Sequence, residues 1–106
     1  MDNFKIIYRI LKILEKSMSL EEFDNTQLTA EALNLDYPYW SRIMTLLVNE
    51  GYITGVYSAT YLSSTYPQVT LERPEITLKG LEYLNENSLM KKAARSAKGI
   101  IEIIKP

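Results

Sequence analysis

The spacing of apolar residues changes at Gly51, and this change most limits how the chain can fold. Between Tyr37 and Glu50 the apolar residues recur at helical spacing, which predicts a helix. Pro38 lies in the first turn of this helix, where the missing N–H of proline costs little. Glycine is the residue type that usually follows a helix in left-handed conformation. Two runs rich in β-branched and aromatic residues follow, YITGVYS and QVTLERPEI, and predict a β-hairpin. Pro74 predicts an edge position or the end of the second strand.

The residues upstream of this helix predict two others. Residues 3–17 carry two adjacent apolar stripes, which indicates a long helix that is covered on two sides. The segment TQLTAEALNLD predicts a short helix that begins after Thr26 or Thr29 as N-cap and ends at Asn34 or Asp36.

The residues downstream of the hairpin predict two more helices. The first begins at Thr77, and its three leucines at helical spacing are expected to face the core; they are Leu78, Leu81 and Leu84. Ser88 is placed to cap a last helix over residues 89–105. Gly99 within it lowers the helix propensity by about 1 kcal/mol relative to Ala and favours close approach or a bend.

The order of these elements predicts the fold class. A chain of 106 residues fits one domain. Helix, short helix, capped helix and hairpin in this order predict an α+β fold, mainly α: a winged helix-turn-helix over residues 1–87 with a β-hairpin wing. Residues 88–106 then form an added basic amphipathic helix that packs on the first helix or on a partner chain.

Composition argues against catalysis. The chain has no histidine and no cysteine, so it lacks the commonest general base and metal ligand as well as any thiolate nucleophile. The four glycines stand singly, which excludes the common phosphate loops. We therefore expect no enzyme activity, no cofactor and no metal. No apolar run approaches the roughly 20 residues that cross a bilayer, so a cytoplasmic protein without a membrane partner is expected.

Two stretches resemble a known family. They are LTAEALNLDYPYWSRIMTLLVNEGYITGV and PEITLKGLEYLNENSLMKK, and together they are similar to the YjcQ-like family of small bacterial and prophage winged-helix proteins. The segments EGYI and ITLKGLEYL also resemble, more loosely, MarR-like regulators. The resemblance implies a winged-helix fold in a bacterial or prophage protein and a presumption of DNA binding, and it carries no catalytic residues.

The charge distribution tests that presumption. Residues 1–87 contain seven Lys and Arg against twelve Asp and Glu, whereas residues 88–106 contain five against one. An acidic body predicts weak DNA binding unless its cations cluster, because phosphate neutralisation provides much of the affinity. One cluster lines the first helix at Lys5, Arg9, Lys12 and Lys16. The other lies in the tail at Lys91, Lys92, Arg95, Lys98 and Lys105. Both rows are equally well explained as the solvated faces of amphipathic helices.

The third helix carries the predicted DNA reader. Its polar stripe places Arg42 for a bidentate bond to guanine and Asn49 for a pair with adenine. The complete predicted reader is Tyr39, Ser41, Arg42, Thr45 and Asn49. The alternative is that this stripe only faces solvent, because one arginine and no lysine is little positive charge for a DNA-recognition helix. For Tyr57 in the hairpin, packing across the strands is favoured over contact with DNA or a partner.

The second apolar stripe of the first helix predicts a homodimer. Its residues are Ile6, Ile10 and Ile13, and the matching residues in the tail are Ile100, Ile101 and Ile104. The tail either folds back within its own chain, which gives a monomer, or crosses to a second copy. Two function classes therefore stay open: the expected function is a transcriptional regulator that binds double-stranded DNA, which the fold favours, and the alternative is a winged-helix module that binds another protein, which the net charge favours.

Overall fold

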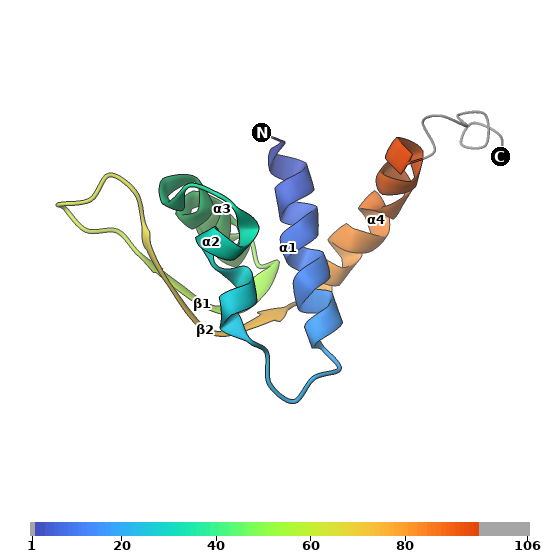
Figure 1. Ribbon diagram of the computed structural model, residues 1–106, viewed down its shortest axis with the longest axis horizontal. Coiled ribbons are helices and arrows are strands. Elements are labelled where there is room, and N and C mark those ends of the chain that lie inside the picture. The colour runs from blue at the N-terminus through green and yellow to red at the C-terminus, as the bar shows by residue number, and fades with distance from the viewer. Residues whose placement is uncertain (1, 96–106) are drawn as a thin grey trace.

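The computed structural model describes residues 2–95, with side-chain surroundings as far as Ser88. Its elements in chain order are α1 (Asn3–Ser17), the 3₁₀ turn η1 (Asn25–Leu28), α2 (Ala30–Leu33), α3 (Tyr37–Asn49), β1 (Ile53–Ala59), β2 (Gln68–Ile76) and α4 (Leu78–Arg95). Over these residues the fold is α+β and mainly helical, with one two-stranded antiparallel sheet (Figure 1). This arrangement is compatible with a winged helix-turn-helix, as the sequence predicted.

Side-chain caps and left-handed residues define where the helices begin and end. The hydroxyl of Thr29 accepts a hydrogen bond from the Ala32 N–H at 3.2 Å, so Thr29 is the N-cap of α2. Asn34 closes α2 at φ 58° and Gly51 follows α3 at φ 82°. The predicted ends of α2 and α3 are thereby confirmed.

The core lies between α1, the short α2, α3 and the inner face of the hairpin. Its fully buried side chains include Ile10 and Leu14 of α1, Met44 of α3 and Ile53 of β1. Trp40 joins α3 to the turn before α2, because its indole N–H donates to the Leu28 carbonyl at 2.9 Å in a buried position. This bond attaches α3 to the turn that precedes α2.

The hairpin contains a β-bulge that the sequence did not predict. Thr54 pairs with Glu75 and Val56 pairs with Leu71, so three residues of β2 lie opposite Gly55. Gly55 has φ 76°, and a Cβ atom there would lie 1.8 Å from the Arg73 carbonyl oxygen. Only glycine fits this site. Pro74 lies buried within the bulge, and β2 continues past it to Ile76, so Pro74 does not end the strand.

The C-terminal helix differs from the prediction in two ways. It runs without a break through Ser88, whose hydroxyl donates to the Asn85 carbonyl inside the helix and does not cap a new one. The expected boundary between residues 87 and 88 therefore falls within α4, and the part of the expected helix after Arg95 lies outside the described residues. Leu84 is buried as predicted, but Leu78 is exposed, because Gly80 is the residue of the first turn of α4 that packs against Tyr52 and Ile76.

Candidate interaction surface

Helix α3 presents two different lines of side chains away from the core. One line faces the hairpin and the other faces outward. Ser41 and Thr45 form the first line, and Arg42, Leu46 and Asn49 form the second. The two lines are separated because residues four apart lie above one another on a helix, whereas neighbouring residues point about 100° apart.

Ser41 and Thr45 are not available as DNA contacts. Ser41 is fully buried and its hydroxyl donates to the Pro38 carbonyl at 3.1 Å. Thr45 donates to the Ser41 carbonyl at 2.7 Å, and its hydroxyl also lies 2.7 Å from the Ser58 hydroxyl of β1. The prediction that these two residues are exposed was wrong, because the hairpin packs against the side of α3 that a helical wheel leaves to solvent.

Arg42 and Asn49 do lie on the exposed side of α3. Leu46 lies between them and is 54% exposed, although it is apolar. The Arg42 guanidinium donates to the Thr65 carbonyl at 3.0 Å and so connects α3 to the loop between the strands. The outward stripe thus consists of the Arg42 guanidinium, which is already hydrogen-bonded within the chain, the Leu46 side chain and the Asn49 amide.

Tyr39 belongs to the joint between α3 and α1. Its hydroxyl donates to the Asn3 side-chain oxygen at 2.5 Å. Desolvation at this half-buried site raises the pKa of the Tyr39 phenol, and the nearby Asp2 carboxylate raises it further. The phenol therefore stays protonated and connects α3 to the start of α1, and its role in DNA contact stays a prediction.

The hairpin and its loop form an arm of residues 53–76 that projects beside α3 (Figure 1). Tyr57 is 58% exposed opposite Thr70, so the predicted cross-strand packing leaves more than half of its side chain in solvent. Tyr61 and Leu62 of the loop are exposed as well, and Leu62 has no cover at all. In contrast, Tyr66 packs its ring on Tyr37 of α3.

Charge is nearly absent from α3 and from the part of the arm that ends at Leu71. Residues 37–71 contain two charged side chains, Arg42 and Glu50, out of twelve Lys and Arg and thirteen Asp and Glu in the chain. We call the outward stripe of α3 with the exposed loop side chains the α3–arm surface; its members are Arg42, Leu46, Asn49, Tyr61 and Leu62. The sequence already displayed this lack of charge, and it is the signal by which Leu46, Tyr61 and Leu62 could have been found.

The basic row of α1 is partly occupied by contacts within the chain. Lys12 forms an ion pair with Glu15 at 2.8 Å, which raises the pKa of the Lys12 amine chiefly through their hydrogen bond. Arg9 donates to the Leu33 carbonyl at the end of α2, at 3.4 Å. Of the predicted basic tail, Lys91, Lys92 and Arg95 lie in the last turns of α4, and Lys98 lies outside the described residues.

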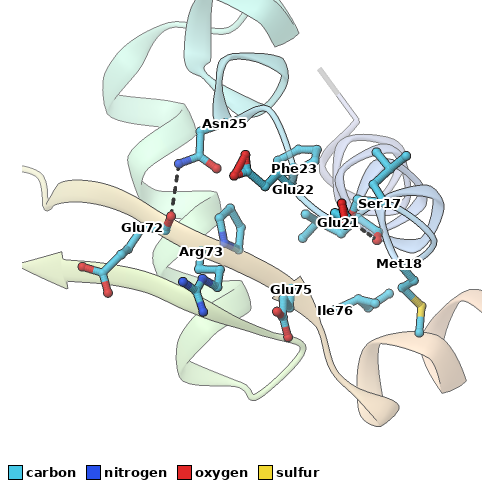
Figure 2. A pocket seen from close by; sticks show the side chains of 13 residues that line it. Ser17, Met18, Glu21, Glu22, Phe23, Asn25, Glu72, Arg73, Glu75 and Ile76 are labelled. Atoms are coloured by element: carbon cyan, nitrogen blue, oxygen red, sulfur yellow. Dashed lines mark hydrogen bonds between the residues drawn. The ribbon is translucent and has the colours of Figure 1, made fainter.

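A cleft of about 670 Å³ lies on another side of the molecule, between the α1–η1 linker (residues 18–24) and β2 (Figure 2). Its walls carry four carboxylates, from Glu21, Glu22, Glu72 and Glu75, around the guanidinium of Arg73. At one end the Asn25 amide donates to the Leu71 and Glu72 carbonyls, both at 3.2 Å. This excess of negative charge disfavours a phosphate or nucleic-acid ligand.

The predicted dimer stripe lies mostly inside the chain. Ile10 is fully buried in the core, and Ile6 and Ile13 are half-buried against it. Helix α4 and β2 both contact α1, so the second side of this helix is covered within one chain. Ile10 is therefore unavailable to a partner, which corrects the prediction. The tail residues Ile100, Ile101 and Ile104 lie outside the described residues.

Fold and surface together define a small α+β domain, compatible with a winged helix, in which residues 37–71 carry little charge. Residues 8–103 match the family model described as YjcQ protein, and the chain belongs to this family. A protein of Bacillus subtilis (strain 168), described as "Uncharacterized protein YjcQ", is 31% identical over 105 residues, which are 99% of this chain and 100% of that protein. No solved structure matches the chain. The predicted family is thus confirmed, and the likeness to MarR-like regulators stays a prediction.

A search for membrane-spanning segments gives a simple result over the same part of the chain. None of the helices within residues 2–95 combines the length and the apolar character needed to cross a membrane.

Proposed function

We propose that this protein is a non-enzymatic winged-helix module that binds another protein through its α3–arm surface. The observation that carries the proposal is the lack of charge over residues 37–71, in a chain where charged residues are otherwise frequent. In a winged helix this region would contact DNA, and phosphate contacts require lysine and arginine.

The exposed residues suit a protein partner. Protein interfaces are depleted of charged residues at their centre and enriched in tyrosine, because large amphipathic rings bury area at little entropic cost. Leu46, Tyr61 and Leu62 are exposed apolar or aromatic side chains on one charge-poor region. Removing them from water costs no ionic desolvation, which favours a contact that is dry at its centre.

The arm is also held in place before any partner arrives. Arg42 bonds the Thr65 carbonyl, the Thr45 and Ser58 hydroxyls bond each other, and the Tyr37 hydroxyl accepts from the Val69 N–H at 3.3 Å. These contacts connect α3 to both strands and to the loop. A surface that is already ordered loses less conformational entropy on binding, which supports useful affinity from a small area.

Site-specific photo-crosslinking in the native cell tests the proposal. A photoreactive residue at position 62 should give covalent adducts with a protein, and Tyr61→Lys in the same chain should reduce them. The matched control is the same photoreactive residue at position 86, an exposed site on α4. Equal adducts at positions 62 and 86, or adducts that Tyr61→Lys leaves unchanged, would contradict a binding role for the α3–arm surface.

DNA binding by a transcriptional regulator is the second candidate function, and a specific observation favours it. Arg42 and Asn49 are both exposed on the helix that a helix-turn-helix places in the major groove. This function predicts a mobility shift of random duplex DNA at low salt, with affinity that falls as salt rises and weakens in Asn49→Ala and Arg42→Gln. If such a shift occurs and both substitutions reduce it, the regulator replaces the protein-binding module. If no duplex shifts at low salt, this candidate fails.

A further inference from the structure

The two outer edges of the sheet are protected to very different degrees. On the β2 side, the Asn25 amide occupies the Leu71 and Glu72 carbonyls, and the strand carries Glu72, Arg73 and Pro74 in succession. Side-chain cover, charge and proline are the devices by which proteins prevent unwanted strand pairing. Figure 2 shows β2 lying between the linker and β1, with Asn25 bonded at its edge.

The outer edge of β1 has none of these devices. The strand reads ITGVYSA, without charge or proline. It pairs with β2 on one side, and within residues 2–95 no hydrogen bond of its backbone leads to any other element. Helix α3 packs on the inner face, where Ser58 meets Thr45, and within the described residues it makes no hydrogen bond to the backbone of β1. Within the described chain, the outward N–H and C=O groups of β1 are therefore open to another strand.

We propose that β1 pairs in antiparallel fashion with β1 of a second copy of this chain, which joins the two hairpins into one four-stranded sheet. An antiparallel ladder between identical strands is self-complementary, as a two-fold interface requires. Tyr57 is exposed on the outer face near the middle of β1, so pairing would bring the Tyr57 rings of the two copies together.

The charge distribution is the reason for choosing a second copy as the occupant. Residues 1–87 have an excess of five acidic side chains, so most contacts between these parts of two copies would oppose like charges. Residues 51–71 contain no charged side chain and form the part of this region where like copies can meet without that cost. The proposal concerns the backbone edge of β1 and does not depend on the side chains of the α3–arm surface.

Sedimentation of the full chain, with paired charge variants, tests the inference. We expect the wild type to dimerise at roughly tens of micromolar, a threshold that corresponds to weak but useful association. Tyr57→Lys and Tyr57→Glu, measured separately, should each weaken the dimer about tenfold or more, because a like charge then faces itself across the two-fold axis. An equimolar mixture of the two variants should restore association. Leu78→Lys, at another exposed apolar residue, is the control and should dimerise like the wild type.

Hydrogen exchange distinguishes this interface from others. In the monomer, the outward amides of β1 exchange fast, and they should become protected as the protein concentration rises. A wild type that stays monomeric, a dimer unchanged by both Tyr57 variants, or a dimer whose β1 amides stay unprotected would overturn the proposal. Ala59→Lys, on the exposed last residue of β1, repeats the test if a Tyr57 variant unfolds. Protection of the same amides by another protein in a monomeric chain would also overturn it, while the proposed function would stand.

Discussion

The half of the molecule formed by α1, the linker and α4 differs from the half formed by α3 and the arm in its use of charge. In the first half charged groups make structural contacts: Asp2 caps α1, Lys12 pairs with Glu15, and Arg9 bonds the end of α2. In the second half the contacts are made by hydroxyls, rings and backbone groups, with Arg42 as the exception. The same core thus supports two different surfaces. The surface of α1, the linker and α4 is charged and solvated, whereas the surface of α3 and the arm can be removed from water at a low cost in free energy.

Substitution at Gly55, in the bulge of the second half, should have the largest effect on stability. Gly55→Ala should lower the free energy of unfolding by about 3 kcal/mol or more, because the added Cβ would collide with the Arg73 backbone at a positive φ. Urea unfolding measures the loss. Gly51→Ala is the matched control: φ is also positive there, but the nearest atom is the Lys79 side chain at 4.0 Å, so a loss of about 1 kcal/mol is expected. Equal losses at both glycines would contradict the collision.

The indole bond that joins α3 to the turn η1 should give the next largest effect. Trp40→Phe removes the donor to the Leu28 carbonyl and leaves a buried acceptor and a small cavity, which should cost about 2 kcal/mol. Tyr37→Phe is the control, since it keeps the ring contacts and loses a long hydrogen bond near the surface, and it should cost about 0.5 kcal/mol. A Trp40→Phe variant as stable as Tyr37→Phe would show that this bond does not position α3.

Loss of the amide that covers the edge of β2 should have a smaller effect. Asn25→Ala should lower the free energy of unfolding by about 1 kcal/mol and speed amide exchange in β2. Gln27→Ala, at an exposed neighbour in η1, should change neither quantity. If β2 exchange is unchanged in Asn25→Ala, the linker does not protect that edge, and the contrast between the two edges weakens.

The acid response of Asp24 should be the smallest effect and should concern the first half alone. Hydrogen bonds from the Thr26 hydroxyl and N–H lower the pKa of the Asp24 carboxyl below its ordinary 3.8. Its contribution to stability is therefore complete above that ordinary value and is lost as the pH falls through the lowered pKa. The drop in urea midpoint between pH 7 and pH 2 should be smaller in Asp24→Asn than in the wild type. Asp36→Asn is the control, because Asp36 makes no capping hydrogen bond, and an unchanged drop in Asp24→Asn would refute the coupling.

Local signals predicted the elements well. The apolar spacing of residues 3–17, the capping hydroxyl of Thr29, Pro38 in the first turn of α3 and Gly51 after its end each act within a few residues of the chain. Such signals depend on backbone geometry that a short segment determines by itself. For this reason the boundaries of α1 and α3 and the existence of the hairpin follow from the sequence.

The candidate site was predicted less well, and Ser41 shows the reason. A helical wheel identifies neighbouring side chains along one helix but does not show which neighbouring element will cover a polar stripe. The hairpin covers Ser41 and Thr45, and it leaves Leu46 exposed although that residue is apolar. The same limit explains Ile10, which was predicted at a dimer interface and lies in the core of its own chain.

The sequence by itself therefore determined the family, the order of the elements, their caps and the low charge of residues 37–71. The tertiary structure decided which faces are covered, that α4 continues through Ser88, that β2 bulges around Gly55, and that the edge of β1 is left open within the described chain. Caps and spacing act over one or two helical turns, whereas burial and edge protection depend on contacts between residues such as Asn25 and Leu71, which are distant in the chain.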